Sequence, residues 1–288
     1  MREFPKRVLV AIVLIPIVVG CVWAGGPALV TLLALASGLA AWEFYRLAEA
    51  RGARPLIVAG VVLSALVPLL VHARYLGYWV PPVSVVILLV PALLTLVLFT
   101  RGTARGTAGG PMGAVSITLT GVLYTGGMLS AVYALRYHEF ILDAKGGTAL
   151  ALLPVVVTWI NDSGAYLAGR AFGRAKLMPT VSPGKTWAGA YGAVVASVLA
   201  TWVFAQFVLP ATAHLTMQPV PILVTGIVLS VAAQVGDLAE SMFKREAGVK
   251  DSSHLIPGHG GVLDRVDSLL FTLPVGYVLL GAFLSYTP

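Results

Sequence analysis

The chain has 288 residues, of which 58% are hydrophobic and only 11% are charged, whereas about a quarter of the residues of an ordinary soluble domain are charged. This composition excludes a soluble globular protein and favours one that crosses a membrane several times. The formal net charge of +7 then indicates membrane orientation and contact with anionic lipid head groups, and we expect no nucleic-acid binding.

Long apolar stretches alternate with short polar connections along the chain. Because a bilayer needs roughly 20 apolar residues per helix, we predict an all-α, polytopic integral membrane protein with about nine transmembrane helices. The predicted spans are 8–24, 28–46, 56–72, 80–99, 112–135, 148–169, 187–209, 221–240 and 266–285. They exclude a barrel of short alternating strands. We therefore predict one integral-membrane domain over 1–288, with N-terminal spans in 1–140 and C-terminal spans in 148–288.

The first span allows two interpretations. A basic start followed by an apolar stretch is also typical of a signal peptide, and the residues 18–21 resemble a lipoprotein cleavage box. Eight further spans already hold the chain in the membrane, which favours a retained helix with Cys21 as a small apolar residue. A single cysteine allows no intramolecular disulfide.

The basic residues indicate an orientation. With the N-terminus in the cytoplasm, 16 of the 19 Lys and Arg residues lie on the cytoplasmic side of these spans, and the exceptions are Arg74, Arg136 and Lys145. This asymmetry is the one that the positive-inside rule predicts. We therefore expect a multi-pass protein of the cell (inner or plasma) membrane, with its N-terminus and its polar site facing the cytoplasm.

Two polar segments of the C-terminal half precede the main cluster of charge. Asp162 lies in the segment 159–170 at the inner end of the sixth span. A carboxylate inside a membrane helix must face a wet cavity or a cation, or make a structural hydrogen bond to a neighbouring helix. The segment 182–187 opens the seventh span with Ser182, Lys185 and Thr186, which form either a phosphate-binding corner or a simple helix cap. A P-loop is excluded because the upstream strand and the glycine spacing are absent.

The third polar segment, 234–267, contains two acidic pairs. Asp237 and Glu240 are three residues apart, as are Asp264 and Asp267, so each pair lies on one helix face. The predicted loop between them carries Lys244, Arg245, Lys250, His254, His259, Gly260 and Gly261. Carboxylates at two helix ends around a basic loop indicate hard cations bound beside phosphates. The alternative is a loop whose charges neutralise one another through salt bridges. His259 either binds phosphate or only stabilises the loop.

From Ser241 to Asp267 the chain resembles the phosphatidate cytidylyltransferases, or CDP-diacylglycerol synthases. Their signature is Ser-x-apolar-Lys-Arg, then Lys-Asp after four residues, then Pro-x-His-Gly-Gly-apolar-x-Asp-Arg-apolar-Asp, and every fixed position is present. The segments 161–170, 182–187 and 236–241 also resemble the family. The first five spans add only a similar hydropathy. Departures occur at Gly184, Ala188 and the pair 253–254, so no role is carried over to them.

The resemblance implies the reaction of CTP with phosphatidate to give CDP-diacylglycerol and pyrophosphate, a Mg²⁺-dependent step of phospholipid biosynthesis at the bilayer. A second cation, divalent or monovalent, and a homodimer are compatible with it. The metal ligands that it implies are Asp237 and Asp264, with Asp162, Glu240 and Asp267 as further ligands or orienting groups. The implied catalytic residues are Asp237, Asp264, Lys250 and Arg265. The implied substrate-binding residues are Ser182, Lys185, Thr186, Lys244, Arg245, His259, Gly260 and Gly261.

Two other functions remain open. A CTP-dependent membrane lipid kinase, such as one acting on a polyprenol, would share a CTP site but transfer the γ-phosphate. A membrane transporter would also place acidic residues in membrane helices, but it should show broken helices or paired repeats near the midplane. Here the charges gather at the predicted cytoplasmic ends of the spans.

Overall fold

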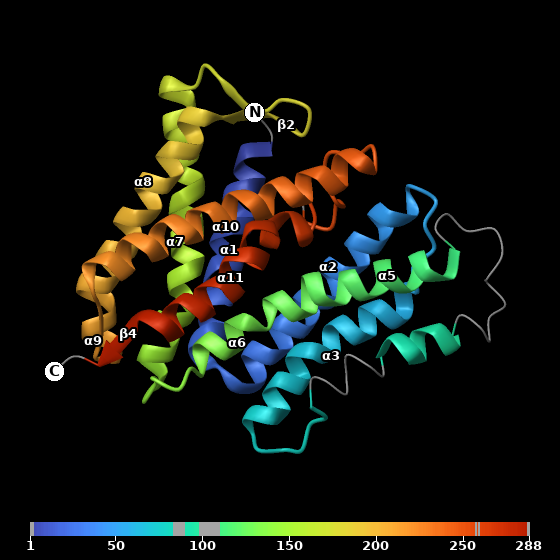
Figure 1. Cartoon of the computed structure of the whole chain (residues 1–288), viewed down its shortest axis with the longest axis horizontal. Coiled ribbons are helices and arrows are strands. Elements are labelled where there is room, and N and C mark those ends of the chain that lie inside the picture. The colour runs from blue at the N-terminus through green and yellow to red at the C-terminus, as the bar shows by residue number, and fades with distance from the viewer. Residues whose placement is uncertain (1–2, 83–89, 98–109, 257, 259, 287–288) are drawn as a thin grey trace. The chain divides into compact units, whose positions relative to one another are not determined.

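Helices form most of the regular secondary structure of the chain (Figure 1). The structure is a computed structural model and describes residues 3–82, 90–97, 110–256, 258 and 260–286. The α-helices are α1 (Glu3–Ala24), α2 (Gly26–Glu49), α3 (Ile57–Tyr75), α5 (Gly110–Val122), α6 (Ala131–Arg136), α7 (Ala144–Phe172), α8 (Trp187–Val203), α9 (Leu209–Ala213), α10 (Pro219–Glu246) and α11 (Leu263–Phe283). Two π-helical segments, η1 (Leu123–Gly127) and η2 (Phe204–Val208), continue α5 and α8.

Seven helical segments in the described part of the chain are long and apolar enough to cross a membrane. They are Gly26–Glu49, Ile57–Tyr75, Gly110–Arg136, Ala144–Phe172, Trp187–Ala213, Pro219–Glu246 and Leu263–Phe283. Each coincides with a predicted span, so the prediction of a mostly helical, multi-pass membrane protein is confirmed. The predicted span 8–24 falls on α1, whose apolar part is Ile12–Ala24. Of the predicted span 80–99, residues 83–89 and 98–99 lie outside the described residues, and residues 90–97 are helical.

The chain forms two compact units, each built from segments that are distant in sequence. Unit 1 comprises 1–12, 29–130 and 243–265, and unit 2 comprises 13–28, 131–242 and 266–288. Unit 1 thus contains nearly all of α2, α3 and α5, and unit 2 contains α6 to α9 with most of α10 and α11. The single integral-membrane domain stays a prediction.

Small and hydroxyl side chains bring the helices of unit 1 together. Tyr45 of α2 is fully buried, and its hydroxyl donates to the carbonyl of Thr118 in α5 at 2.7 Å. A Cβ at Gly60 or at Gly121 would collide with the Tyr45 ring, so glycine is required at both contacts. Such close, polar helix contacts are typical of membrane interiors, where association relies on packing and hydrogen bonds.

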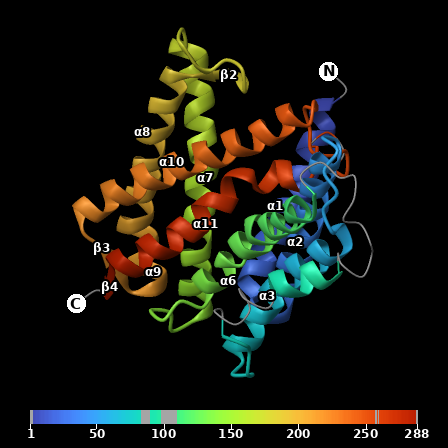
Figure 2. The ribbon, with the colours of Figure 1, turned by 45° about the vertical axis from the view of Figure 1, so that its right-hand side comes forward.

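In unit 2, α7 and α8 lie side by side over much of their length (Figure 2). Gly164 and Gly192 allow this approach, because a Cβ at either would collide with the facing helix. Both helices begin at a side-chain cap: Asp143 accepts from the N–H of Gly146 at 2.7 Å before α7, and Thr186 accepts from the N–H of Gly189 at 3.1 Å before α8.

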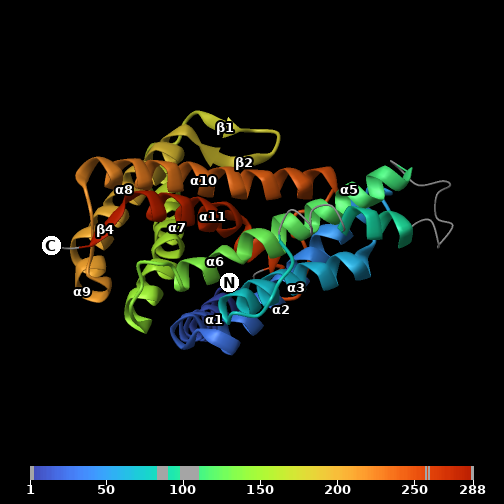
Figure 3. The same cartoon turned by 60° about the horizontal axis from the view of Figure 1, so that its bottom comes forward.

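Two short antiparallel strand pairs add to the helices. β1 (Lys176–Met178) and β2 (Ser182–Thr186) form the hairpin that links α7 to α8 (Figure 3). β3 (Leu215–Met217) pairs with β4 (Leu284–Tyr286). The segment 182–187, predicted to open the seventh span, is therefore largely the strand β2, and the helix begins at Trp187.

The loop before α11 begins later than predicted. Lys244 and Arg245 were predicted in that loop, but they lie in the last turn of α10. Cations at this position are stabilised by the carbonyl end of the helix. The connection between α10 and α11 thus comprises residues 247–262, and we call it the signature loop.

Candidate functional site

A cavity of about 390 Å³ lies in unit 2, where the end of α7, the strand β2, the start of α8 and the second half of α10 meet. Its lining combines two carboxylates, Asp162 and Asp237, with two cations, Arg170 and Lys185. The remaining lining is formed by small, polar or aromatic residues, among them Asn161, Tyr166, Gly169, Thr186 and Gln234. The structure thus brings together four residues that the sequence singled out: Asp162, Lys185, Thr186 and Asp237.

Asp237 and Lys185 form the ion pair of this cavity. The Lys185 Nζ lies 2.9 Å from Oδ2 of Asp237. The contact is an electrostatic pairing and not a directed hydrogen bond, because among the described residues Nζ has no hydrogen-bond partner of good geometry. Oδ1 of Asp237 accepts from the Ser241 hydroxyl at 3.3 Å. The Asp237 side chain is still 38% exposed, so this carboxylate remains accessible to a ligand in the cavity.

A polar network holds the wall of the cavity at Asn161. Its side-chain oxygen accepts from Ser197 of α8 at 3.2 Å and from Ser230 of α10 at 2.7 Å. Its amide nitrogen donates to Asp162 at 3.3 Å, which orients that carboxylate on the cavity wall. The sequence analysis did not identify the two serines. Their signal would have been polar side chains inside apolar spans, which bind neighbouring helices more often than ligands.

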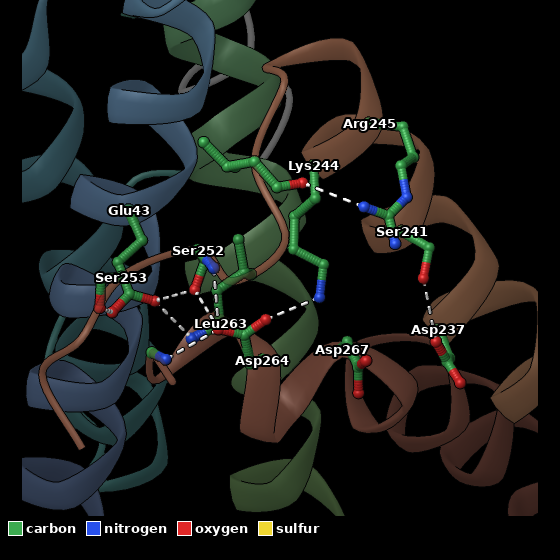
Figure 4. A network of polar contacts seen from close by, with 12 residues as sticks. Glu43, Asp237, Ser241, Lys244, Arg245, Ser252, Ser253, Leu263, Asp264 and Asp267 are labelled. Atoms are coloured by element: carbon green, nitrogen blue, oxygen red, sulfur yellow. Dashed lines mark hydrogen bonds and ion pairs between the residues drawn. The ribbon is translucent and has the colours of Figure 1, made fainter. Parts of the chain in front are cut away.

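In unit 1, Asp264 lies at the centre of a second polar cluster (Figure 4). Oδ1 accepts from the Lys244 ammonium at 2.7 Å. Oδ2 accepts from the backbone and the hydroxyl of Ser252, at 2.9 and 2.7 Å, and from the N–H of Gly261 at 2.8 Å. The side chains of Lys244 and Asp264 are 14% and 4% exposed. Three of these contacts fall on Oδ2 and one on Oδ1, so protein donors use most of the acceptor positions of Asp264.

The same cluster contains a carboxylate that the sequence analysis missed. Glu43 of α2 is fully buried and accepts hydrogen bonds from Ser252, Ser253, Val262 and Leu263. An acidic residue near the end of the predicted span 28–46 was the available signal, because such residues are rare in membrane helices and mark functional or structural sites.

The comparisons with known proteins agree on one family. The model of the cytidylyltransferase family matches residues 5–283. The phosphatidate cytidylyltransferase of Pseudomonas aeruginosa is 34% identical over 278 residues, which cover 96% of this chain and 97% of that protein. The chain belongs to the cytidylyltransferase family.

Other members of the family match a shorter part of the chain. The phosphatidate cytidylyltransferase of Haemophilus influenzae is 45% identical over 150 residues, which are 51% of this chain and 50% of that protein. That of Bacillus subtilis is 44% identical over 161 residues, 54% of this chain and 57% of that protein. The chain therefore spans about half the length of these two relatives. The uncharacterized protein YnbB of Escherichia coli is 35% identical over 199 residues, 67% of this chain and 63% of that protein.

The other site residues that the sequence predicted for this cytidylyltransferase-family chain are spread over both units. Glu240 is buried in α10, and Asp267 accepts from the N–H of Ser268 at 2.6 Å. Gly236 lets α10 pass close to the backbone of Asp267, since a Cβ there would collide with the Asp267 carbonyl. Three basic residues are exposed: Arg245, Lys250 and Arg265. Ser182 lies in β2 and does not line the cavity, whereas His259 lies outside the described residues.

The acidic residues of the cavity fit a magnesium site of the kind that nucleotides complete. Within the described ranges, no group of three or more His, Cys, Asp or Glu residues could hold a metal ion by itself. Mg²⁺ commonly binds through only one or two carboxylates, with waters and substrate phosphates as its other ligands. Asp162 and Asp237, which line the same cavity, supply that donor set. At Asp264 a metal ion would compete with Lys244, Ser252 and Gly261 for the carboxylate oxygens.

Proposed function

We propose that this membrane protein is a phosphatidate cytidylyltransferase, which converts CTP and phosphatidate into CDP-diacylglycerol and pyrophosphate. The observation that carries the proposal is the cavity of unit 2, in which two carboxylates and two cations face one volume at the end of apolar helices. The family membership and the match along nearly the whole Pseudomonas aeruginosa relative support the same activity.

The chemistry of the reaction explains this mixture of charges. The phosphate of phosphatidate must attack the α-phosphorus of CTP, so two anions have to meet in one site. Lys185 and Arg170 bind phosphate oxygens and reduce this repulsion. Asp162 and Asp237 hold a divalent cation, which screens the triphosphate and stabilises the departing pyrophosphate. Transfer at phosphorus requires positioning and charge neutralisation more than covalent catalysis by the protein.

In this proposal some acidic residues bind the cation directly, and the others support the site or act only after a rearrangement. Asp237 is the principal ligand of the cation, with Asp162 or Asp267 as the second carboxylate. Glu240 supports the site from within α10, because it is fully buried. A direct role of Asp264 requires that Lys244 release it, for example when Lys244 turns to a substrate phosphate.

The basic residues and the glycines outside the cavity are assigned to the phosphates of CTP and phosphatidate. We assign this role to Lys244, Arg245, Lys250, Arg265, His259, Gly260 and Gly261, together with Ser182 and Thr186 of the hairpin strand. Thr186 also caps α8, so the cap and the phosphate-binding interpretation of this segment are compatible. Phosphatidate enters from the bilayer, and the site faces the cytoplasm of the cell membrane. A second cation and a homodimer remain predictions.

The test is the fate of two labels in parallel reactions. The purified full chain is incubated in phosphatidate-containing vesicles with Mg²⁺ and CTP labelled at either the α- or the γ-phosphate. A cytidylyltransferase transfers the α-label into the organic phase and leaves the γ-label in water as pyrophosphate. The proposal is wrong if no α-label enters the lipid in a Mg²⁺-dependent manner.

The same experiment separates the alternatives. A CTP-dependent lipid kinase would transfer the γ-label to the lipid and leave the α-label in water as CDP. A transporter would leave both labels in unreacted CTP. Asp237→Asn is the matched negative control, because it keeps the size of the side chain and removes only its charge. Addition of a chelator should abolish the transfer, and excess Mg²⁺ should restore it.

A further inference from the structure

Glu43 belongs to none of the segments that resemble the family signature, yet it lies against the signature loop. It is a residue of α2 with 0% relative exposure. A buried carboxylate is costly unless hydrogen bonds compensate for the lost water. The partners of Glu43 therefore determine what this residue does.

Four donors surround the Glu43 carboxylate, and all of them lie between residues 252 and 263 (Figure 4). Oε1 accepts from the Ser253 hydroxyl at 2.6 Å and from the N–H of Val262 at 3.0 Å. Oε2 accepts from the N–H of Leu263 at 2.6 Å and from the Ser252 hydroxyl at 3.0 Å. The Ser252 hydroxyl has a single proton, which Glu43 shares with Asp264 at 2.7 Å, so the other three donors provide the full hydrogen bonds to Glu43.

The two backbone contacts place Glu43 at the N-terminus of α11, which begins at Leu263. The first N–H groups of a helix have no partner within the helix, and the positive end of the helix dipole favours a carboxylate. Glu43 thus caps α11 from a different helix. A Cβ at Gly261 would collide with the Glu43 carboxylate and with the Ser252 hydroxyl, which explains glycine at this position without invoking a ligand.

The next residue of α2, Phe44, contacts the end of α10 that precedes the signature loop. The ring of Phe44 packs edge-on against Phe243 of α10 at a centroid distance of 5.5 Å, and both rings contact Tyr124 at 5.7 Å. Phe243 directly precedes Lys244, which pairs with Asp264 at 2.7 Å. Two consecutive residues of α2 therefore contact both helices that flank the signature loop. Phe44 packs against the end of α10, and Glu43 binds the start of α11.

We propose that Glu43 is a positioning residue for the cytidylyltransferase reaction: it holds the signature loop in place, so that Lys244, Lys250 and Asp264 keep the spacing that the substrate phosphates require. This inference rests on the proposed function, and it gives an N-terminal span a role in the active site. Donors of residues 252–263 surround the Glu43 carboxylate, so we assign it a role that acts through the loop and not on the reacting atoms.

The test compares Glu43→Gln with the wild type in the full chain. Gln keeps the shape of Glu, but one acceptor oxygen becomes an NH₂ group that faces N–H donors. We expect the amides of 251–263 to exchange hydrogen at least about tenfold faster, since charge-assisted hydrogen bonds are lost. The value of kcat/KM should fall by a similar factor. Exchange in α7 and α8 should stay as in the wild type, which a general loss of stability would not allow.

Two further variants make the result decisive. Glu49→Gln removes a carboxylate from the same helix at an exposed site, where it pairs with Arg46 at 2.7 Å, and it should change neither exchange nor turnover. Ser253→Ala removes one donor from the loop side and should accelerate loop exchange by less than Glu43→Gln. If Glu43→Gln does not fold, Ser253→Ala decides, and wild-type exchange in that variant would overturn the proposal.

Other results would also overturn it: wild-type loop exchange in Glu43→Gln, unchanged kcat/KM in that variant, or equal effects of Glu49→Gln. A failure of the proposed function is recognised separately, because then the wild type itself transfers no α-label to lipid. The exchange measurement needs no substrate, so in that case it still supports or overturns the anchoring of the loop by Glu43.

Discussion

Asp237 and Asp264 carry the same carboxylate in different surroundings. Asp237 lines a cavity, keeps 38% of its side chain exposed and faces one ammonium group. Asp264 is 4% exposed and accepts four hydrogen bonds, one of them from the Lys244 ammonium, whose side chain is 14% exposed. The Lys185–Asp237 pair is the more exposed of the two, with side chains that are 23% and 38% exposed. Loss of the carboxylate charge should therefore cost less stability at Asp237 than at Asp264.

These surroundings predict different effects of one substitution. Asp237→Asn should reduce the formation of CDP-diacylglycerol by about 10- to 100-fold and lower the thermal midpoint less than Asp264→Asn does, because the Asp237 side chain is 38% exposed. Asp264→Asn should also reduce activity, but it should lower the free energy of unfolding by about 3–5 kcal/mol, because one partner of a buried ion pair is removed. Lipid product and thermal unfolding in detergent measure the two effects. Equal thermal midpoints for both variants would contradict this distinction.

At the scale of elements, the connection between α6 and α7 contains a buried, titratable side chain. The loop between α6 and α7 contains His138, whose ring is buried between Phe140, at 5.0 Å, and Tyr277 of α11, at 5.4 Å. Its Nδ1 accepts from the N–H of Phe140 at 3.4 Å, which requires that this nitrogen carry no proton. Burial lowers the pKa of His138 below its usual value of 6.5, although the charge of Glu139 acts in the opposite direction.

This lowered pKa predicts a pH dependence of stability. Below pH 6.5 the unfolded chain binds a proton at His138 that the folded chain does not bind, so the free energy of unfolding decreases as the pH falls towards the folded-state pKa. Thermal midpoints of the wild type should therefore decrease more between pH 7 and pH 5 than those of His138→Gln, which does not titrate. Parallel pH profiles of the two proteins would show that His138 makes no such contribution.

At the scale of the whole molecule, the sequence predicts what depends on local composition. Long apolar stretches must be satisfied by helices in a membrane, and seven predicted spans coincide with helices of the structure. The hairpin of β1 and β2 was not predicted, because strands of three and five residues with exposed polar side chains carry no clear periodicity. The sequence predicted the polar segments that line the cavity, but it did not predict that they meet in one cavity.

The contacts of Glu43 could not be predicted for a different reason. Its hydrogen-bond partners are 209 to 220 residues away along the chain. No local pattern in a single sequence specifies such a pairing. An acidic residue in an apolar span requires a polar partner, and the packing of unit 1 identifies the start of α11 as that partner.

The last prediction concerns the orientation of the whole chain, and α10 is the element that tests it. Its 28 residues correspond to about 42 Å, more than the roughly 30 Å of a bilayer core. Its ends are flanked by the exposed residues Gln218 and Val249.

In a Cys21→Ser background, Val249→Cys should react with a membrane-impermeant thiol reagent only from the cytoplasmic side, and Gln218→Cys only from the opposite side. Labelling of both from one side would show that α10 does not cross the membrane. The reverse pattern would preserve the multi-pass fold but place the signature loop outside the cytoplasm, where CTP is not supplied.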